Sequence, residues 1–203
     1  MPPAHPRRRW WGICACYTLV LYLTLPLGRP VITWARAQFT PAQQQAGTWV
    51  VFAALALALV IYLVSLRRVV RPVAYVCALL LARVYWYELT RLTQYPEERF
   101  HFIEYGVLAV LLYGAWRQHV GAGWAYLGAA VTGVLIGAGD EGVQYLTKYI
   151  PALVRVLGCT WSNPNMFRRY FGWPDVWLNV LGVLYGLVFW ATVVQNRRAT
   201  APP

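Results

Sequence analysis

Three apolar stretches of the chain carry polar side chains at a spacing that places them on one face of a helix. Residues three or four positions apart lie side by side on an α-helix. The residues are His101, Glu104 and Tyr105 in the first stretch, Asp140, Glu141 and Gln144 in the second, and Asp175 and Asn179 in the third, where Gly182 continues the same face. A bilayer interior excludes such groups unless they pair with one another or face water. The pattern therefore predicts one shared polar pocket between three helices.

The first interpretation of these residues is a polar network that satisfies itself. Arg169 then pairs with Glu141 or Asp175, and His101 bonds to a carboxylate. The amide side chains of the set bridge the remaining groups. Such a network accounts for the residues without any ligand, because buried membrane charges occur mainly when they are paired.

A second interpretation is a binding site for an outer-leaflet or envelope molecule. Arg169, His101 and Gln144 then present hydrogen-bond donors to a phosphate, carboxylate or peptide group. Converging polar groups at a helix-end cleft, with aromatic neighbours over the apolar part of the ligand, suit a polar headgroup. No cofactor is predicted, and a bound lipid fits the apolar surroundings.

A third interpretation is a membrane enzyme that acts on a lipid-linked substrate. One histidine and several carboxylates could hold a divalent metal or perform acid and base catalysis. The sequence has no His-Glu-x-x-His, paired-histidine or nucleophile motif. We therefore expect no catalytic residues and no metal site, and favour a protein that is not an enzyme.

The composition is that of an integral membrane protein. Of the 203 residues, 59% are hydrophobic and 12% are charged, with a mean hydropathy of +0.44. In soluble domains about a quarter of all residues are charged. The net charge of +11 comes from arginines that flank apolar runs, as topology signals do, so no nucleic-acid partner is expected.

Six apolar segments are long enough to span a bilayer, for which roughly twenty residues are needed. They lie at about 10–27, 48–66, 70–88, 100–118, 121–140 and 174–194. Together they predict an all-α fold: a polytopic membrane helix bundle with about six transmembrane helices, forming one membrane domain over residues 1–203. The first segment is expected to be a retained anchor rather than a cleaved signal peptide.

The distribution of charge predicts the orientation of the chain. With both termini in the cytoplasm, arginines crowd the short inner loops and tails, where the positive-inside bias is strongest. All seven acidic residues then lie toward the outer face, so the polar pocket opens outward. The basic residues are almost all arginine, which is typical of a GC-rich bacterial genome. We therefore expect a multi-pass protein of the bacterial inner membrane.

Two further features predict contacts rather than chemistry. Small-residue repeats allow close approach of helices, and they occur at Gly133 and Gly137 and again at Gly182 and Gly186. The longest outer loop is rich in aromatic side chains that suit either the membrane surface or a partner protein. The predicted partner-contact residues are Trp161, Tyr170, Phe171 and Trp173.

The ordered set of polar motifs resembles the VanZ-like family of bacterial membrane proteins. The matching elements cover roughly residues 98–190. They are Glu98-Arg99-Phe100-His101-Phe102-Ile103-Glu104-Tyr105-Gly106, then Asp140-Glu141 with Gln144, and then Arg169 with Asp175, Asn179 and Gly182. The chain departs from the family pattern by an aromatic insertion of about twenty residues, at about 146–167.

The resemblance implies an envelope-associated role in binding or protection, without demonstrated catalysis. The family is named for a protein associated with resistance to the antibiotic teicoplanin. An alternative of a different class is an accessory or scaffold subunit of a larger membrane complex, respiratory or photosynthetic, which the aromatic insertion favours. Membrane lipids, and integral membrane proteins in the scaffold alternative, are the expected partners.

Overall fold

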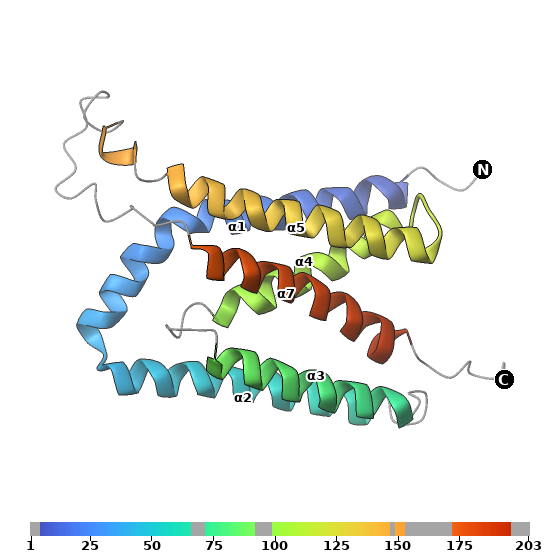
Figure 1. Cartoon of the computed structure of the whole chain (residues 1–203), viewed down its shortest axis with the longest axis horizontal. Coiled ribbons are helices and arrows are strands. Elements are labelled where there is room, and N and C mark those ends of the chain that lie inside the picture. Colours follow the sequence, from blue (N-terminus) through green and yellow to red (C-terminus); the bar gives the residue numbers. More distant parts are fainter. Residues whose placement is uncertain (1–4, 66–71, 92–98, 147–148, 153–171, 196–203) are drawn as a thin grey trace.

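The computed structural model describes residues 5–65, 72–91, 99–146, 149–152 and 172–195. The elements in these ranges are helices, and no strand occurs among the described residues (Figure 1). They are α1 (His5–Gln38), α2 (Pro41–Ser65), α3 (Pro72–Arg91), α4 (Arg99–Trp116), α5 (Ala122–Leu146), α7 (Trp173–Phe189) and the π-helical turn η4 (Trp190–Val194). The prediction of an all-helical fold is therefore confirmed for the described residues.

Three of the described helices are long and apolar enough to cross a membrane. They are Pro41–Ser65, Ala122–Leu146 and Trp173–Val194, and shorter apolar helices lie at Pro72–Tyr87 and Phe100–Trp116. The chain therefore has the helices of a membrane protein, as its composition predicts. The arrangement with six spans stays a prediction.

The helices run alternately in opposite directions (Figure 1). The start of α1, the turn between α4 and α5, and the end of η4 lie at one end of the molecule. The end of α5 and the start of α7 lie at the other. The core is formed where α4 packs against α5, α7 and the first half of α1, so the polar stretches of α4, α5 and α7 meet at the same end.

Glycines bring the backbones of α4 and α7 into direct contact. A Cβ atom added at Gly186 would lie 2.6 Å from the Cα atom of Gly106, and one at Gly182 would lie 2.8 Å from the carbonyl oxygen of Phe102. Any larger side chain at either position would meet main-chain atoms, which cannot rotate away. The two glycines of α7 therefore allow the closest helix contact in this part of the core.

The glycines of α5 make room for side chains rather than for backbone. A Cβ atom at Gly133 would lie 2.9 Å from Cγ2 of Val183, and one at Gly137 would lie 2.9 Å from Cβ of Asn179 and 3.2 Å from Cε1 of Tyr105. The small residues of α5 thus accept groups from both α4 and α7, and they bring Asn179 and Tyr105 together.

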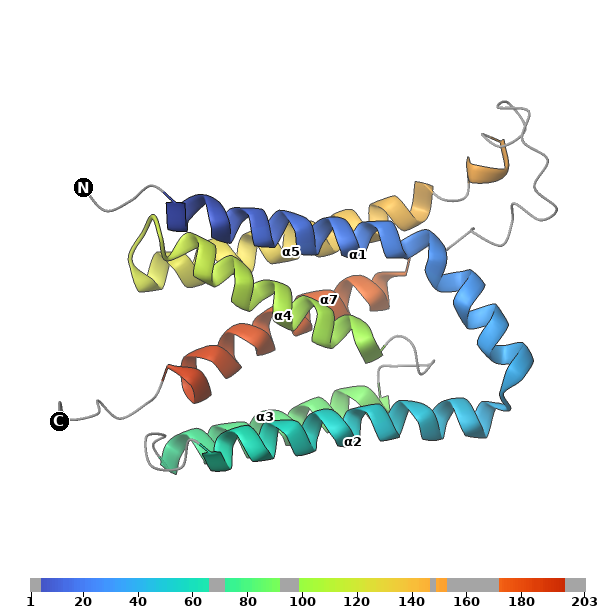
Figure 2. The same ribbon diagram turned by 180° about the vertical axis from the view of Figure 1, so that it is seen from behind.

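Helix α1 packs against both α4 and α5. Seen from behind, its first half runs alongside α5, and the helix then bends toward α2 (Figure 2). Prolines occur at 26 and 30, in the middle of the helix. A proline there lacks the backbone N–H of a helical hydrogen bond, which favours a kink. Two phenol groups attach the first half, because the Tyr17 hydroxyl donates to the carbonyl of Glu104 (3.1 Å) and that of Tyr22 to the carbonyl of Ile136 (2.7 Å).

The bond from Tyr22 is expected to contribute to stability. Tyr22→Phe removes the donor and leaves the ring in place, so the free energy of unfolding should fall by about 1 kcal/mol, the usual net value of one hydrogen bond. Titration with sodium dodecyl sulfate in bicelles measures that energy. Tyr87→Phe is the matched control, since Tyr87 is 52% exposed; an equal loss in both variants would contradict a specific role for the Tyr22 bond.

A second set of hydrogen bonds joins the helices at the opposite end. The amide of Gln195 donates to the hydroxyl of Tyr113 (2.7 Å), and its oxygen accepts from the hydroxyl of Tyr126 (2.9 Å). The π-helical turn brings Gln195 to this position, where its backbone N–H donates to the carbonyl of Trp190 (2.9 Å). One amide therefore connects the end of the α7 segment to both α4 and α5.

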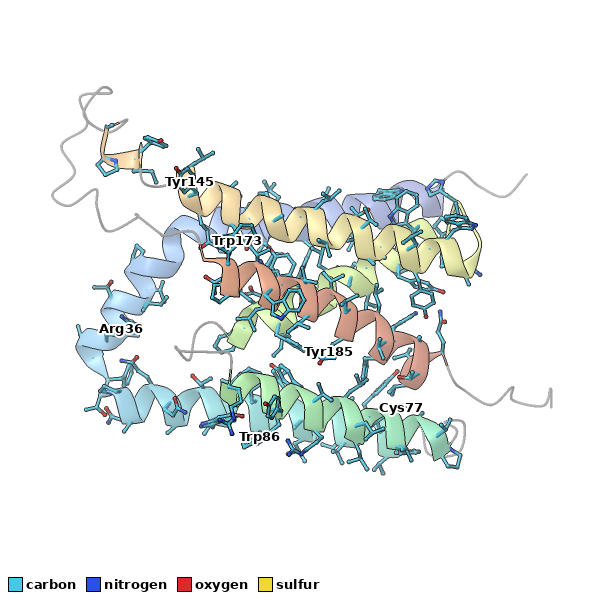
Figure 3. All side chains as sticks on the ribbon, in the orientation of Figure 1. Arg36, Cys77, Trp86, Tyr145, Trp173 and Tyr185 are labelled. Atoms are coloured by element: carbon cyan, nitrogen blue, oxygen red, sulfur yellow. The ribbon has the colours of Figure 1, made fainter. Side chains whose placement is uncertain are left out.

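Helices α2 and α3 form a separate layer that contacts the core through aromatic rings. The rings of Trp49 on α2 and Trp86 on α3 lie 4.9 Å apart between centroids. Tyr85 of α3 lies 4.1 Å from Phe102 of α4, which in turn lies 5.0 Å from Tyr185 of α7. Figure 3 shows Tyr185 on α7 and Trp86 on the α2–α3 pair. The pair is therefore attached to the core by rings of α3, together with Phe52 of α2, whose ring lies 5.7 Å from that of Phe100 on α4.

Candidate functional site

The polar residues of α4, α5 and α7 that are most deeply buried form one cluster, which we call the polar cluster. It lies at the end of the molecule where α5 ends and α7 begins (Figure 1). Its members are Tyr105, Glu141 and Gln144, which have no exposed surface, and Asn179 and Asp140, which are 1% and 2% exposed. Burial of this degree is uncommon for carboxylates, and it demands partners for their oxygen atoms.

The hydrogen bonds of the cluster converge on its two carboxylates. The Tyr105 hydroxyl donates to Oδ2 of Asp140 at 2.7 Å. The side-chain amide of Gln144 donates to Oδ1 of Asp140 at 3.2 Å and to Oε1 of Glu141 at 2.9 Å. One amide thus bridges two neighbouring carboxylates, which the helix allows because Gln144 follows them at i+4 and i+3.

Helix α7 contributes at its first turns. Asn179 donates from Nδ2 to the carbonyl of Gly137 at 3.2 Å, while its Oδ1 atom is buried and has no hydrogen-bond donor among the described residues. The backbone N–H of Gly172 lies 3.4 Å from Oε2 of Glu141. These contacts connect α7 to α5 on both sides of the carboxylates.

Three predicted site residues lie at the margin of the cluster, with more exposure. The side chains of His101 and Glu104 are 12% and 42% exposed, and Nδ1 of His101 lies 3.7 Å from Oε2 of Glu104. That distance exceeds a hydrogen bond. Asp175 is half-buried in the first turn of α7, next to Gly172. These groups lie at the same end of the bundle as the buried carboxylates.

Several predicted residues fall on parts of the chain that are not described. Arg169, Trp161, Tyr170 and Phe171 lie outside the described residues, as does most of the insertion at 146–167. The predicted pairing of Arg169 with Glu141 or Asp175 therefore stays a prediction. Trp173 is described, and it is 75% exposed at the start of α7.

Some contacts of the site were missed by sequence reasoning. Tyr22 of α1 approaches α5 so closely that a Cβ atom at Gly139 would lie 2.6 Å from its hydroxyl. Gly172 also belongs to the site, through its N–H near Glu141. A phenol within an apolar segment is itself a usable signal, because a buried hydroxyl needs a partner.

The arrangement can hold two carboxylates in fixed positions inside an apolar bundle. Within the described part of the chain, no group of three His, Cys, Asp or Glu side chains is placed to hold a metal ion. What the described geometry provides is a set of acceptor oxygens held by the Tyr105 hydroxyl, the Gln144 side-chain amide and the backbone N–H of Gly172, at the same end as the more exposed His101, Glu104 and Asp175.

The fold and the cluster together define the class: an all-helical membrane protein with polar groups buried between three helices at one end. Comparison with family models, with curated proteins and with solved structures gave no match. The function is therefore argued from the residues and their geometry.

Proposed function

We propose that the chain is a VanZ-like multi-pass protein of the bacterial inner membrane that binds an envelope molecule without catalysis. The observation that carries the proposal is the convergence of Tyr105, Asp140, Glu141 and Gln144 from two helices, with Asn179 of α7 beside them. The ordered motifs of the VanZ-like pattern supply these same residues. In this proposal six helices span the membrane, both termini are cytoplasmic, and the cluster lies toward the outer face.

The chemistry of the cluster favours a ligand that donates hydrogen bonds. Its donors, the Tyr105 hydroxyl and the Gln144 amide, are directed at the carboxylates of Asp140 and Glu141. The more exposed carboxylates at the margin, Glu104 and Asp175, add acceptors at the same end. An ammonium or amide group of a lipid headgroup or cell-wall peptide is the chemical class that such oxygens bind best.

In this proposal the buried and exposed groups have different roles. The buried carboxylates hold α4, α5 and α7 in register, while Glu104 and His101 contact the ligand. Glu104→Gln keeps the shape of the side chain and removes its charge. A charge-assisted hydrogen bond contributes about 1.5–3 kcal/mol, so retention of the ligand should fall at least about tenfold.

Native mass spectrometry of the full chain, extracted from its membrane with a mild detergent, measures that retention. The expected result is a small-molecule adduct on the unaltered protein that is largely lost from Glu104→Gln. Arg117→Gln is the control, because Arg117 is an exposed ionisable residue just beyond the end of α4 that lies farthest from the cluster. An adduct that persists equally in both variants, or a protein that carries none, would count against binding at this site.

A second candidate function is an accessory subunit of a larger membrane complex. It is favoured by exposed helix surfaces that another protein could cover. Only 11% of the apolar 18-residue segment of α2 is buried, and Trp173 is 75% exposed. The same mass spectra distinguish it, because a stoichiometric protein partner that is lost from Trp173→Ala would support this candidate.

An enzyme that acts on a lipid-linked substrate is the third interpretation, and turnover of such a substrate would be its signature.

A further inference from the structure

Helix α3 carries two arginines and two aromatic residues in one line along its exposed side. Arg83, Trp86, Tyr87, Thr90 and Arg91 occupy positions i, i+3, i+4, i+7 and i+8, so they lie on one face of the helix. All five are exposed, with Trp86 at 53% and Tyr87 at 52%. We call this set the α3 basic stripe.

The stripe does not overlap the face by which α3 packs against the core. That face includes Ala74, which has no exposed surface, and Tyr85, whose ring lies 4.1 Å from that of Phe102. Trp86 instead packs against Trp49 of α2, within the α2–α3 pair (Figure 3). The stripe is therefore available to whatever surrounds the protein.

Neither arginine of the stripe forms an ion pair with a residue whose side chain the structure describes. Arg91 lies 5.9 Å from the ring centroid of Tyr87. Arg83 is eight residues from the end of α3, which corresponds to about 12 Å along the helix. A guanidinium at that depth is costly in hydrocarbon unless it reaches an anion at the interface.

An apolar track continues the stripe toward the start of α3. Val76, Leu79 and Leu80 precede Arg83 by seven, four and three residues, so they share its face. They are 55%, 71% and 61% exposed. Aromatic residues above such a track mark the depth of lipid headgroups. The face thus places Arg91 and the two aromatic residues at headgroup depth, with Arg83 about one turn further in and an apolar surface beneath it.

We propose that the α3 basic stripe is a binding site for an anionic phospholipid. The phosphate is held by the guanidinium of Arg91, and the side chain of Arg83 extends toward it from below. A guanidinium has the planar set of donors that matches phosphate oxygens. The acyl chains lie along Val76, Leu79 and Leu80, beside the tryptophan pair. The apolar track favours a lipid over the carboxylate of a partner protein, because a carboxylate alone leaves the track uncovered.

Site-specific photocrosslinking of the full chain in nanodiscs tests the proposal. A benzoylphenylalanine placed at Leu80 reports on the lipid beneath the stripe, and one placed at Leu135 of α5, which is 66% exposed, reports on bulk lipid. The nanodiscs contain equal amounts of phosphatidylglycerol and phosphatidylcholine. The ratio of phosphatidylglycerol adducts to phosphatidylcholine adducts at Leu80 should exceed the same ratio at Leu135. The expected excess is about fivefold for each arginine that contributes.

Variants separate the stripe from general surface charge. Arg83→Gln together with Arg91→Gln should return the adduct ratio at Leu80 to the value at Leu135. Arg9→Gln, which removes an exposed arginine at the start of α1, should leave the ratio at Leu80 unchanged. Equal ratios at Leu80 and Leu135 in the unaltered chain would overturn the proposal. So would capture of a protein rather than lipid at Leu80 in native membranes, which would assign the stripe to a partner subunit.

Discussion

Replacing Gly186 by Val should lower the free energy of unfolding by about 3 kcal/mol, the upper part of the usual range for overpacking. A Cβ atom at this position would lie 2.6 Å from the Cα and 2.8 Å from the carbonyl carbon of Gly106. Because these are backbone atoms, α4 and α7 must move apart to admit the side chain. Their separation also opens the packing around Tyr105, so the loss extends to the polar cluster. Titration with sodium dodecyl sulfate in bicelles measures the change.

Gly142→Val is the matched control for this prediction. Gly142 lies in α5, and a Cβ atom there would meet no atom within 4 Å. Substitution in open space is expected to change the free energy of unfolding by no more than about 0.5 kcal/mol. A similar loss in both variants would show that valine in these helices is harmful in itself, and that the contact between α4 and α7 is not what Gly186 protects.

The sequence predicted the helices better than their ends. The last predicted span, at about 174–194, matches the structure from Trp173 to Val194, because a proline lies in the first turn of the helix and the segment that follows is mostly apolar. The first predicted segment ended at about residue 27, whereas α1 continues to Gln38. Hydropathy detects the apolar part of a helix, and a polar continuation beyond a proline carries no such signal.

The polar cluster was predictable in its membership but not in its bonds. Spacing alone places Asp140, Glu141 and Gln144 on one face of α5, and the structure buries all three. Spacing does not specify that the hydroxyl of Tyr105 donates to Asp140, because that contact depends on how α4 and α5 pack. For the same reason the contribution of Tyr22 was missed, since 114 residues separate it from its acceptor on α5.

Asp140→Ala should have an effect as large as that at Gly186, for a different reason. The Asp140 carboxylate accepts from both Tyr105 and Gln144 in a fully buried setting. Its removal leaves the Tyr105 hydroxyl without that acceptor and takes one acceptor from the Gln144 amide. Each buried donor left unsatisfied costs about 1–3 kcal/mol, so the free energy of unfolding should fall by about 3 kcal/mol. Asp140→Asn keeps an acceptor oxygen and should lose about 1 kcal/mol, the value of one ordinary hydrogen bond.

Combining Asp140→Ala with Tyr105→Phe separates hydrogen bonding from lost packing. Tyr105→Phe removes the hydroxyl that Asp140→Ala would strand, so the double variant should be more stable than the sum of the single losses predicts, by about 1 kcal/mol. The same bicelle titration on all four proteins gives this coupling energy. Strictly additive losses would mean that the 2.7 Å contact between Tyr105 and Asp140 contributes nothing to stability. A positive coupling would identify this bond as a link between α4 and α5, which the proposed ligand site requires because Glu104 is held on α4.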